Sequence, residues 1–185
     1  MEIVETELPG VLVIEPEVFG DSRGFFLETW NKQRYAALGV DGEFVQDNLS
    51  LSSRGVVRGL HYQMPHSQAK LVYVIQGDVF DVAVDIRVGS PTFGEWYGAV
   101  LSGENKRQVY VPEGFAHGFS VLTDTALFAY KCSDFYNREA ESGIAWDDPD
   151  LGIDWKVAEP ELSEKDQNLP RLKDVDESRL PVYRG

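Results

Sequence analysis

The chain has a single cysteine, three histidines and no apolar run long enough to span a bilayer. Cys132 therefore cannot form an internal disulfide, and its apolar neighbours predict a small buried side chain without a chemical role. A membrane helix needs about 20 consecutive apolar residues, and the sequence offers none. Residues 1–7 are acidic, whereas a secretory signal begins with basic and then apolar residues. We therefore expect a soluble protein of the cytoplasm.

Positive charge is also scarce, since 17 Lys and Arg stand against 31 Asp and Glu, for a formal net charge of −14. Broad binding to nucleic acid or to an anionic membrane depends on clustered cations, so we expect neither partner. A phosphate can still bind where a few cations converge, because short contacts outweigh a diffuse field that salt screens over about 8 Å. The positions of the few arginines and lysines are therefore informative.

The middle of the chain consists of short apolar segments separated by turns, which predicts an all-β fold rather than a parallel α/β sheet. In residues 79–86, apolar side chains recur at every second position, as in a strand with one buried face. The turn at residues 76–78 predicts a hairpin between strands 71–75 and 79–86. Further strands are expected at residues 95–101, 108–111, 118–122 and 126–132.

Few helices are expected. Residues 31–39 begin with a capping asparagine and end with a glycine, which predicts one short peripheral helix. From about residue 147 onward, prolines and charges dominate, with one helical turn near Ser163. We expect residues 1–185 to form a single domain in which this last segment wraps the strands.

A turn that contains a proline and a glycine precedes His117, which stands at the start of an apolar strand. This stretch, residues 112–118, resembles the second conserved motif of cupins. The implied fold is a mainly β, cupin-type jelly roll, either a barrel or a sandwich. Metal-binding cupins take further histidines from an earlier motif, but here Gln63 stands two residues after His61, and Lys70 would repel a metal ion. Because the third histidine, His66, lies in a polar loop, we expect neither a metal ion nor a cofactor.

The segment 58–63 sets an arginine close to a histidine flanked by strand-like residues. An unperturbed histidine has a pKa of about 6.5, which suits it to proton transfer near neutral pH. On a regular strand Arg58 and His61 would face opposite sides, because they are an odd number of residues apart. Either a bulge at Gly59 brings both side chains to one side, or Arg58 serves a neighbouring site, and the sequence leaves both alternatives open.

Ordered stretches over almost the whole chain resemble the family of dTDP-4-dehydrorhamnose 3,5-epimerases, and they lie at residues 21–25, 44–50, 57–63, 68–71, 111–119, 130–132 and 143–155. The set is specific for the superfamily but less so for the sugar, because relatives that epimerise one carbon share much of it. The resemblance implies metal-independent conversion of dTDP-4-dehydro-6-deoxy-D-glucose to dTDP-4-dehydro-L-rhamnose. The protons at C3 and C5, next to the C4 ketone, would be removed and returned on the opposite face.

By this resemblance, four residues form the catalytic set. His61 takes the position of the base, and Asp166 that of its carboxylate partner. The spacing of Asp166 from a preceding serine also fits a helix cap, and the two roles are compatible. Tyr130 takes the position of the proton donor, with Tyr136 as a second candidate. Lys70 would stabilise negative charge on the C4 oxygen.

The resemblance also implies the residues that bind the substrate. Arg23 and Arg58 would clamp the diphosphate with help from Lys165, and His117 would line the pocket and bond the sugar or carbonyl oxygen. The remaining binding residues would be Phe25, Glu28, Gln46, Asp47, Asn48, Tyr136 and Glu141.

Two further features stay open at this point. Members of the family form homodimers, often by exchanging N-terminal strands, and residues 1–17 are suited to do so here. The main alternative functions are a mono-epimerase acting at C3 or C5 only, a metal-dependent cupin oxygenase or isomerase, and a sugar-nucleotide binding module without catalysis.

Overall fold

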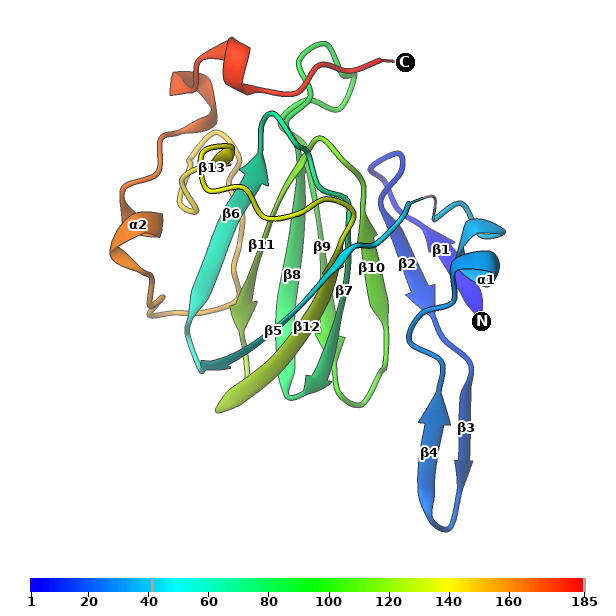
Figure 1. The fold of residues 1–185 in the computed structure, drawn as a ribbon. Helices are drawn as coiled ribbons and strands as arrows, with labels where there is room; N and C mark the ends of the chain where they lie inside the picture. The colour runs from blue at the N-terminus through cyan, green and yellow to red at the C-terminus, as the bar shows by residue number, and fades with distance from the viewer. Residues whose placement is uncertain (41, 185) are drawn as a thin grey trace.

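The computed structural model describes residues 1–40 and 42–184 and contains two antiparallel sheets packed face to face (Figure 1). In spatial order, the six-stranded sheet consists of β1 (Glu2–Glu5), β2 (Leu12–Glu15), β10 (Gln108–Val111), β7 (Lys70–Gln76), β12 (Thr125–Cys132) and β5 (Gln46–Ser53). The five-stranded sheet consists of β13 (Glu141–Gly143), β6 (Val57–Gln63), β11 (Phe115–Val121), β8 (Asp78–Asp85) and β9 (Trp96–Ser102).

Alternating apolar residues from both sheets build the core between them. Val72 and Phe128 of the six-stranded sheet pack in one cluster with Val79 and Phe119 of the five-stranded sheet. Inward-facing side chains of two stacked sheets meet in this way in β-sandwiches. The predicted mainly β fold is confirmed, and of the two predicted forms the chain adopts the sandwich. The strand pairings of the described residues do not close into a barrel.

The turn at residues 76–78 does not form the predicted hairpin. β7 belongs to the six-stranded sheet and β8 to the five-stranded sheet, so the chain crosses from one sheet to the other at this turn. Gly77 has a φ of +79°, and a Cβ there would lie 2.1 Å from the carbonyl oxygen of Thr125. The strand positions were predicted correctly, but the pairing was wrong because a turn signal does not specify which sheet the next strand joins.

The two α-helices are short. The first, α1 (Lys32–Ala36), is capped by Asn31 as predicted and buries Tyr35 against the six-stranded sheet. The second, α2 (Glu164–Gln167), lies in the C-terminal segment, which also contains the 3₁₀ turns η1 (Leu172–Asp174) and η2 (Glu177–Arg179). No helix in the described part of the chain is long and apolar enough to cross a membrane.

The segment after residue 147 runs along the outside of the five-stranded sheet, drawn from yellow to red in Figure 1. Leu151, Trp155 and Leu180 pack in one buried cluster with Val82 and Val84 of β8. This packing brings α2 beside β6, so it carries the carboxylate of α2 to the strand that holds His61.

A separate hairpin of β3 (Val18–Asp21) and β4 (Gly24–Leu27) projects away from the sandwich (Figure 1). Its aromatic side chains are exposed, with 56% of Phe19, 59% of Phe25 and 69% of Phe26 accessible to solvent. Exposed aromatic groups in such number on one hairpin are typical of a surface that contacts another molecule.

Candidate active site

A cavity of about 270 Å³ takes its walls from both sheets of the sandwich. The strands β5, β7 and β12 contribute one side, and β6 contributes the other. The loop between β12 and β13 forms part of its rim. The lining residues are Gln46, Asn48, His61, Tyr62, Gln63, Gln68, Lys70, Tyr130, Cys132, Tyr136 and Glu141.

A β-bulge in β6 sets the direction of the side chains at the cavity. His61 pairs with His117 of β11, whereas Arg58 pairs with Phe119, so three steps on β6 match two on β11. Paired residues of antiparallel strands point to the same face, and the extra residue shifts the alternation by one. Arg58 and His61 therefore share a face, and of the two alternatives that the sequence left open the structure shows the bulge.

Glycine is required at position 59 by both backbone conformation and space. Gly59 has a φ of +131°, in a region that other residues rarely adopt. A Cβ there would lie 2.6 Å from the Cα of Gly118 on the neighbouring strand. Past this bulge, the exposed side chain of Arg58 reaches β5, where its Nε donates a hydrogen bond to Ser52 Oγ at 3.0 Å.

His61 and Asp166 form a hydrogen-bonded dyad, with 2.7 Å between Nε2 and Oδ1. Asp166 is buried, and burial raises its pKa, but the bond with His61 and the nearby imidazole lower it, so that the pKa lies below its usual value. The backbone N–H of Asp166 also donates to Ser163 Oγ at 3.1 Å, so the residue takes part in the helix cap as well. The Nδ1 atom of His61 makes no hydrogen bond with any described residue, which leaves it available to a ligand in the cavity.

Lys70 and Tyr130 lie on the opposite wall of the cavity. Lys70 is half-buried and forms no ion pair with a residue that the structure describes. Burial lowers the pKa of its ammonium group, whereas Cys132, Asp81 and Glu141 act in the opposite direction. Burial also raises the pKa of the Tyr130 hydroxyl, which favours its protonated form. An unpaired cation and a protonated phenol thus stand across the cavity from His61.

The rim of the cavity carries a chain of polar contacts. The Tyr136 hydroxyl donates to Glu141 Oε2 at 2.9 Å, and the Lys165 ammonium lies 2.5 Å from the other carboxylate oxygen. Burial raises the pKa of Glu141, but the bonds from Lys165 and Tyr136 lower it below its usual value. Lys165 precedes Asp166, so the rim is connected directly to the dyad.

His117 lies behind the cavity wall rather than among the residues that line it. Its Nε2 is 2.8 Å from Asp81 Oδ2, and both side chains are buried. The predicted contact of His117 with a sugar therefore finds no support in the lining of the cavity. Within residues 1–40 and 42–184, no three His, Cys, Asp or Glu side chains gather in a way that could hold a metal ion.

Four other predicted binding residues lie away from the cavity of their own chain. Arg23 and Phe25 belong to the projecting hairpin, and Glu28 lies beside α1, where it pairs with Arg34 at 3.5 Å. Asp47 points to the outer face of β5 and pairs with Lys131 at 2.7 Å. Gln46 and Asn48, on the inward positions of the same strand, do line the cavity.

Four residues without a predicted role also line the cavity: Tyr62, Gln63, Gln68 and Cys132. The period of a strand would have identified two of them. Gln63 is two residues from His61, and Cys132 is two residues from Tyr130, so each shares a face with a predicted catalytic residue. Gln68 lies in a loop, where no such period applies.

Comparisons with known proteins agree on one family. The family model described as dTDP-4-dehydrorhamnose 3,5-epimerase matches residues 5–174. A dTDP-4-dehydrorhamnose 3,5-epimerase of Shigella flexneri is 55% identical over 178 residues, covering 95% of this chain and 98% of its own length. A crystal structure of the 3,5-epimerase of Legionella pneumophila, in complex with dTDP-4-keto-L-rhamnose, superposes with a TM-score of 0.98 at 52% identity, covering 100% of this chain and 99% of that one.

A single-carbon epimerase is a more distant relative. The structure of a 3'-monoepimerase from Streptomyces bikiniensis, in complex with dTDP-quinovose, has a TM-score of 0.90 at 37% identity. The match covers 96% of this chain and 92% of that one. The fold is thus common to both kinds of enzyme, and the 3,5-epimerases named above have the higher sequence identity.

Proposed function

Because this chain belongs to the family of dTDP-4-dehydrorhamnose 3,5-epimerases, and is therefore an isomerase, we propose that His61 and Tyr130 exchange protons on opposite faces of its sugar substrate. One observation carries this proposal. The candidate base and the candidate acid line one cavity but come from opposite sheets of the sandwich. A sugar ring held between them has one face toward each residue, which is the arrangement that inversion requires.

The reaction begins when His61 takes the proton from C3 or C5 of dTDP-4-dehydro-6-deoxy-D-glucose. The electron pair of the broken C–H bond forms a C=C double bond to C4, and the π pair of the C4 carbonyl moves onto its oxygen, which becomes a negatively charged enolate; protonation at carbon later restores the carbonyl. Lys70 stabilises this charge, since a fixed cation in a partly desolvated site acts strongly on a developing oxyanion. Tyr130 then donates its proton to the opposite face of the carbon. Solvent restores both side chains before the second carbon reacts.

Asp166 holds His61 in the orientation that this step needs. Its carboxylate accepts from Nε2, which leaves Nδ1 toward the cavity, and it stabilises the imidazolium that forms on proton transfer. Its lowered pKa keeps the carboxylate ionised over the whole neutral range. Asp166 therefore accepts the hydrogen bond of His61 as a carboxylate.

The nucleotide part of the substrate would lie along the opening of the cavity, between Gln46, Asn48 and Lys165 at the rim and Arg58 beside Ser52 toward the end of β5. Short contacts with these two cations would allow a diphosphate to bind to a chain whose net charge is −14. We also propose that the enzyme acts in the cytoplasm, since such a charged substrate does not cross a bilayer unaided.

We further propose that two copies of the chain form a dimer in which each hairpin completes the other copy's site. Arg23 and Phe25 are both predicted to bind substrate but lie on the hairpin, outside their own cavity. The outer face of the six-stranded sheet also exposes apolar side chains that a second copy would cover: Leu49 (62% exposed), Leu51 (65%) and Ile75 (47%). The strands β1 and β2 pair within their own sheet, whereas the hairpin projects from the sandwich, so we propose the hairpin as the segment that reaches the partner's cavity.

Mixing two inactive variants tests this dimer. Arg23→Ala removes the substrate contact made by the hairpin, and His61→Asn removes the base from the cavity. The homodimer of each variant should therefore have very low epimerase activity. In a mixed dimer one site combines an intact cavity with an intact hairpin, and random subunit exchange should restore about one quarter of wild-type activity. A particle that light scattering shows to be monomeric, or a dimer mixture without recovery, would contradict the shared site.

The proposed reaction is tested by the configuration of the product. We expect incubation with dTDP-4-dehydro-6-deoxy-D-glucose to give a sugar inverted at both C3 and C5, as followed by proton coupling constants in NMR spectra. Inversion at one carbon only would identify the protein as a mono-epimerase instead. An unchanged substrate would exclude both activities.

A further inference from the structure

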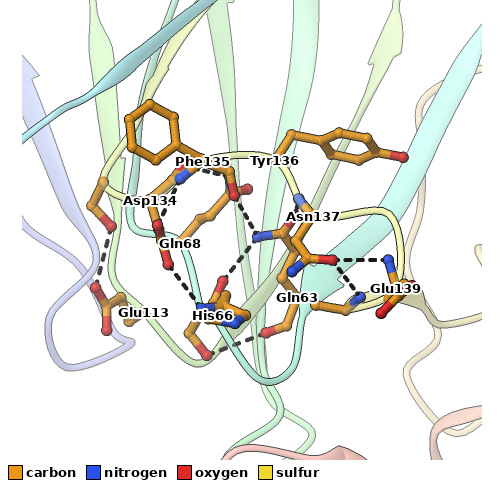
Figure 2. Close-up of polar contacts among 12 residues, drawn as sticks. Gln63, His66, Gln68, Glu113, Asp134, Phe135, Tyr136, Asn137 and Glu139 are labelled. Carbon is orange, nitrogen blue, oxygen red and sulfur yellow. Dashed lines mark hydrogen bonds and ion pairs between the residues drawn. The ribbon is translucent and has the colours of Figure 1, made fainter.

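Residues 133–140 form a loop between β12 and β13 that contains neither a helix nor a strand. Glutamine side chains from outside this loop nevertheless form hydrogen bonds with its successive backbone peptide groups (Figure 2). Gln68 Nε2 donates to the carbonyl oxygen of Asp134 at 2.7 Å. Gln46 Oε1 accepts from the backbone N–H of Tyr136 at 2.8 Å. Since loops are usually the more mobile parts of a fold, such fixed peptide groups require a physical reason.

Gln63 lies at the centre of these hydrogen bonds and contacts the loop on both sides of Tyr136 (Figure 2). Its Nε2 donates to the carbonyl oxygen of Phe135 at 3.3 Å, and its Oε1 accepts from the N–H of Asn137 at 2.7 Å. The same Nε2 donates to the carbonyl oxygen of His66 at 2.9 Å, which ties in the loop after β6. One buried amide thus fixes the peptide groups on both sides of Tyr136.

The chemistry of the amide group is essential to this contact. The two carbonyl oxygens need a donor, and the N–H of Asn137 needs an acceptor, and a primary amide supplies both from one side chain. A carboxylate would set a negative oxygen against the carbonyls of Phe135 and His66. An apolar side chain of similar length would leave all three backbone groups without partners, and buried unpaired polar groups are costly.

The position of Tyr136 determines the rim of the active site. Its hydroxyl donates to Glu141, and Glu141 in turn pairs with Lys165. Displacement of the loop would therefore move Tyr136 and break its hydrogen bond to Glu141, while Glu141, His61, Lys70 and Tyr130 remain on their strands.

We propose that Gln63 is a positioning residue, which fixes Tyr136 against Glu141 at the rim so that the substrate binds to a preformed site. This inference rests on the proposed function, because the rim is the predicted place of the nucleotide. It assigns a task to the position at which metal-binding cupins carry a ligand. The role acts on binding rather than on the proton transfers, which separates it from the roles of His61 and Tyr130.

The variant Gln63→Met keeps the length of the side chain and removes its hydrogen bonds. We expect KM to rise roughly tenfold while kcat stays within about threefold, because the lost contacts order the rim and not the reacting groups. Gln108→Met is the matched control. Gln108 is also buried, and it bonds with Tyr35 and with the carbonyl oxygen of Thr29; none of these three residues lines the cavity, so its loss should lower stability without a change in KM.

Removal of Tyr136 distinguishes positioning from a general loss of structure. In a Tyr136→Ala background, Gln63→Met should raise KM by less than about threefold, because the residue that it positions is already absent. An equal rise of KM in both backgrounds would overturn the proposal. So would a wild-type KM in Gln63→Met.

A second measurement needs no substrate. Phe135 and Tyr136 are exposed aromatic residues in the held loop, so chymotrypsin can report its release. Gln63→Met should be cut after these residues at least about fivefold faster than the wild type and Gln108→Met, because local opening exposes the chain to proteolysis. An equal cutting rate in all three proteins would overturn the positioning role. A wild-type protein without epimerase activity would instead contradict the proposed function and leave this comparison intact.

Discussion

His61→Asn should lower the rate of epimerisation by roughly 10³-fold, because it removes the base from one face of the sugar. Asparagine is too short to place its amide at the position of Nε2, but Asp166 keeps the hydrogen bond from the backbone N–H of Gly59 at 3.5 Å. We therefore expect a folded protein that binds dTDP with nearly wild-type affinity, as measured by calorimetry. The rate itself is followed by NMR of the sugar.

The combination of the two measurements decides the role of His61. Lost turnover with retained binding is the signature of a group that acts in the chemical step. Turnover within about tenfold of the wild type would show that another residue takes the proton. Turnover and binding lost together would point to a structural role for the dyad.

Lys70→Met should lower kcat by roughly 10²- to 10³-fold, the usual cost of removing one group that stabilises a developing oxyanion. Methionine keeps most of the apolar stem and removes the charge. Lys70 has no ion-pair partner among residues 1–40 and 42–184, so its charge is free to act on a ligand. Steady-state kinetics with the dTDP-sugar substrate measures the effect.

Lys173→Met is the matched control for this variant. Lys173 is exposed and pairs with Asp150 on the surface, and exposed pairs of this kind contribute little to stability. We expect its kcat to remain within about twofold of the wild type, since it touches no residue of the cavity. A loss of less than about tenfold in Lys70→Met would contradict the assigned role of Lys70.

The sequence predicts the strands well where one face is apolar, and less well where a strand lines the site. β8 was predicted from the alternation of apolar residues in its sequence, although the structure buries both of its faces. β5 reverses the usual alternation, since Gln46 and Asn48 point inward to the cavity while Leu49 and Leu51 point to solvent. A pattern that places polar residues inside serves ligand binding at the expense of packing, so hydrophobic periodicity alone does not identify this strand.

Long-range contacts were accessible only through the family resemblance. His61 and Asp166 are far apart in the sequence, and only the C-terminal segment packed on the five-stranded sheet brings them together. The bulge at Gly59 was one of two possibilities open to the sequence, and the choice between them depends on the close approach of β11. The pairing of β7 was likewise beyond local signals, because the sheet that a strand joins is a property of the whole topology.

The central claim is that protons leave and arrive on opposite faces of the sugar, with His61 on one wall and Tyr130 on the other. Incubation of Tyr130→Phe with the dTDP-sugar in D₂O tests it most directly, with Tyr136→Phe alongside. We predict that Tyr130→Phe incorporates deuterium at C3 and C5 without inversion, because His61 still removes the protons and returns deuterons on its own face, whereas Tyr136→Phe still inverts both carbons. Deuterated, inverted product formed by Tyr130→Phe at nearly the wild-type rate would contradict the account.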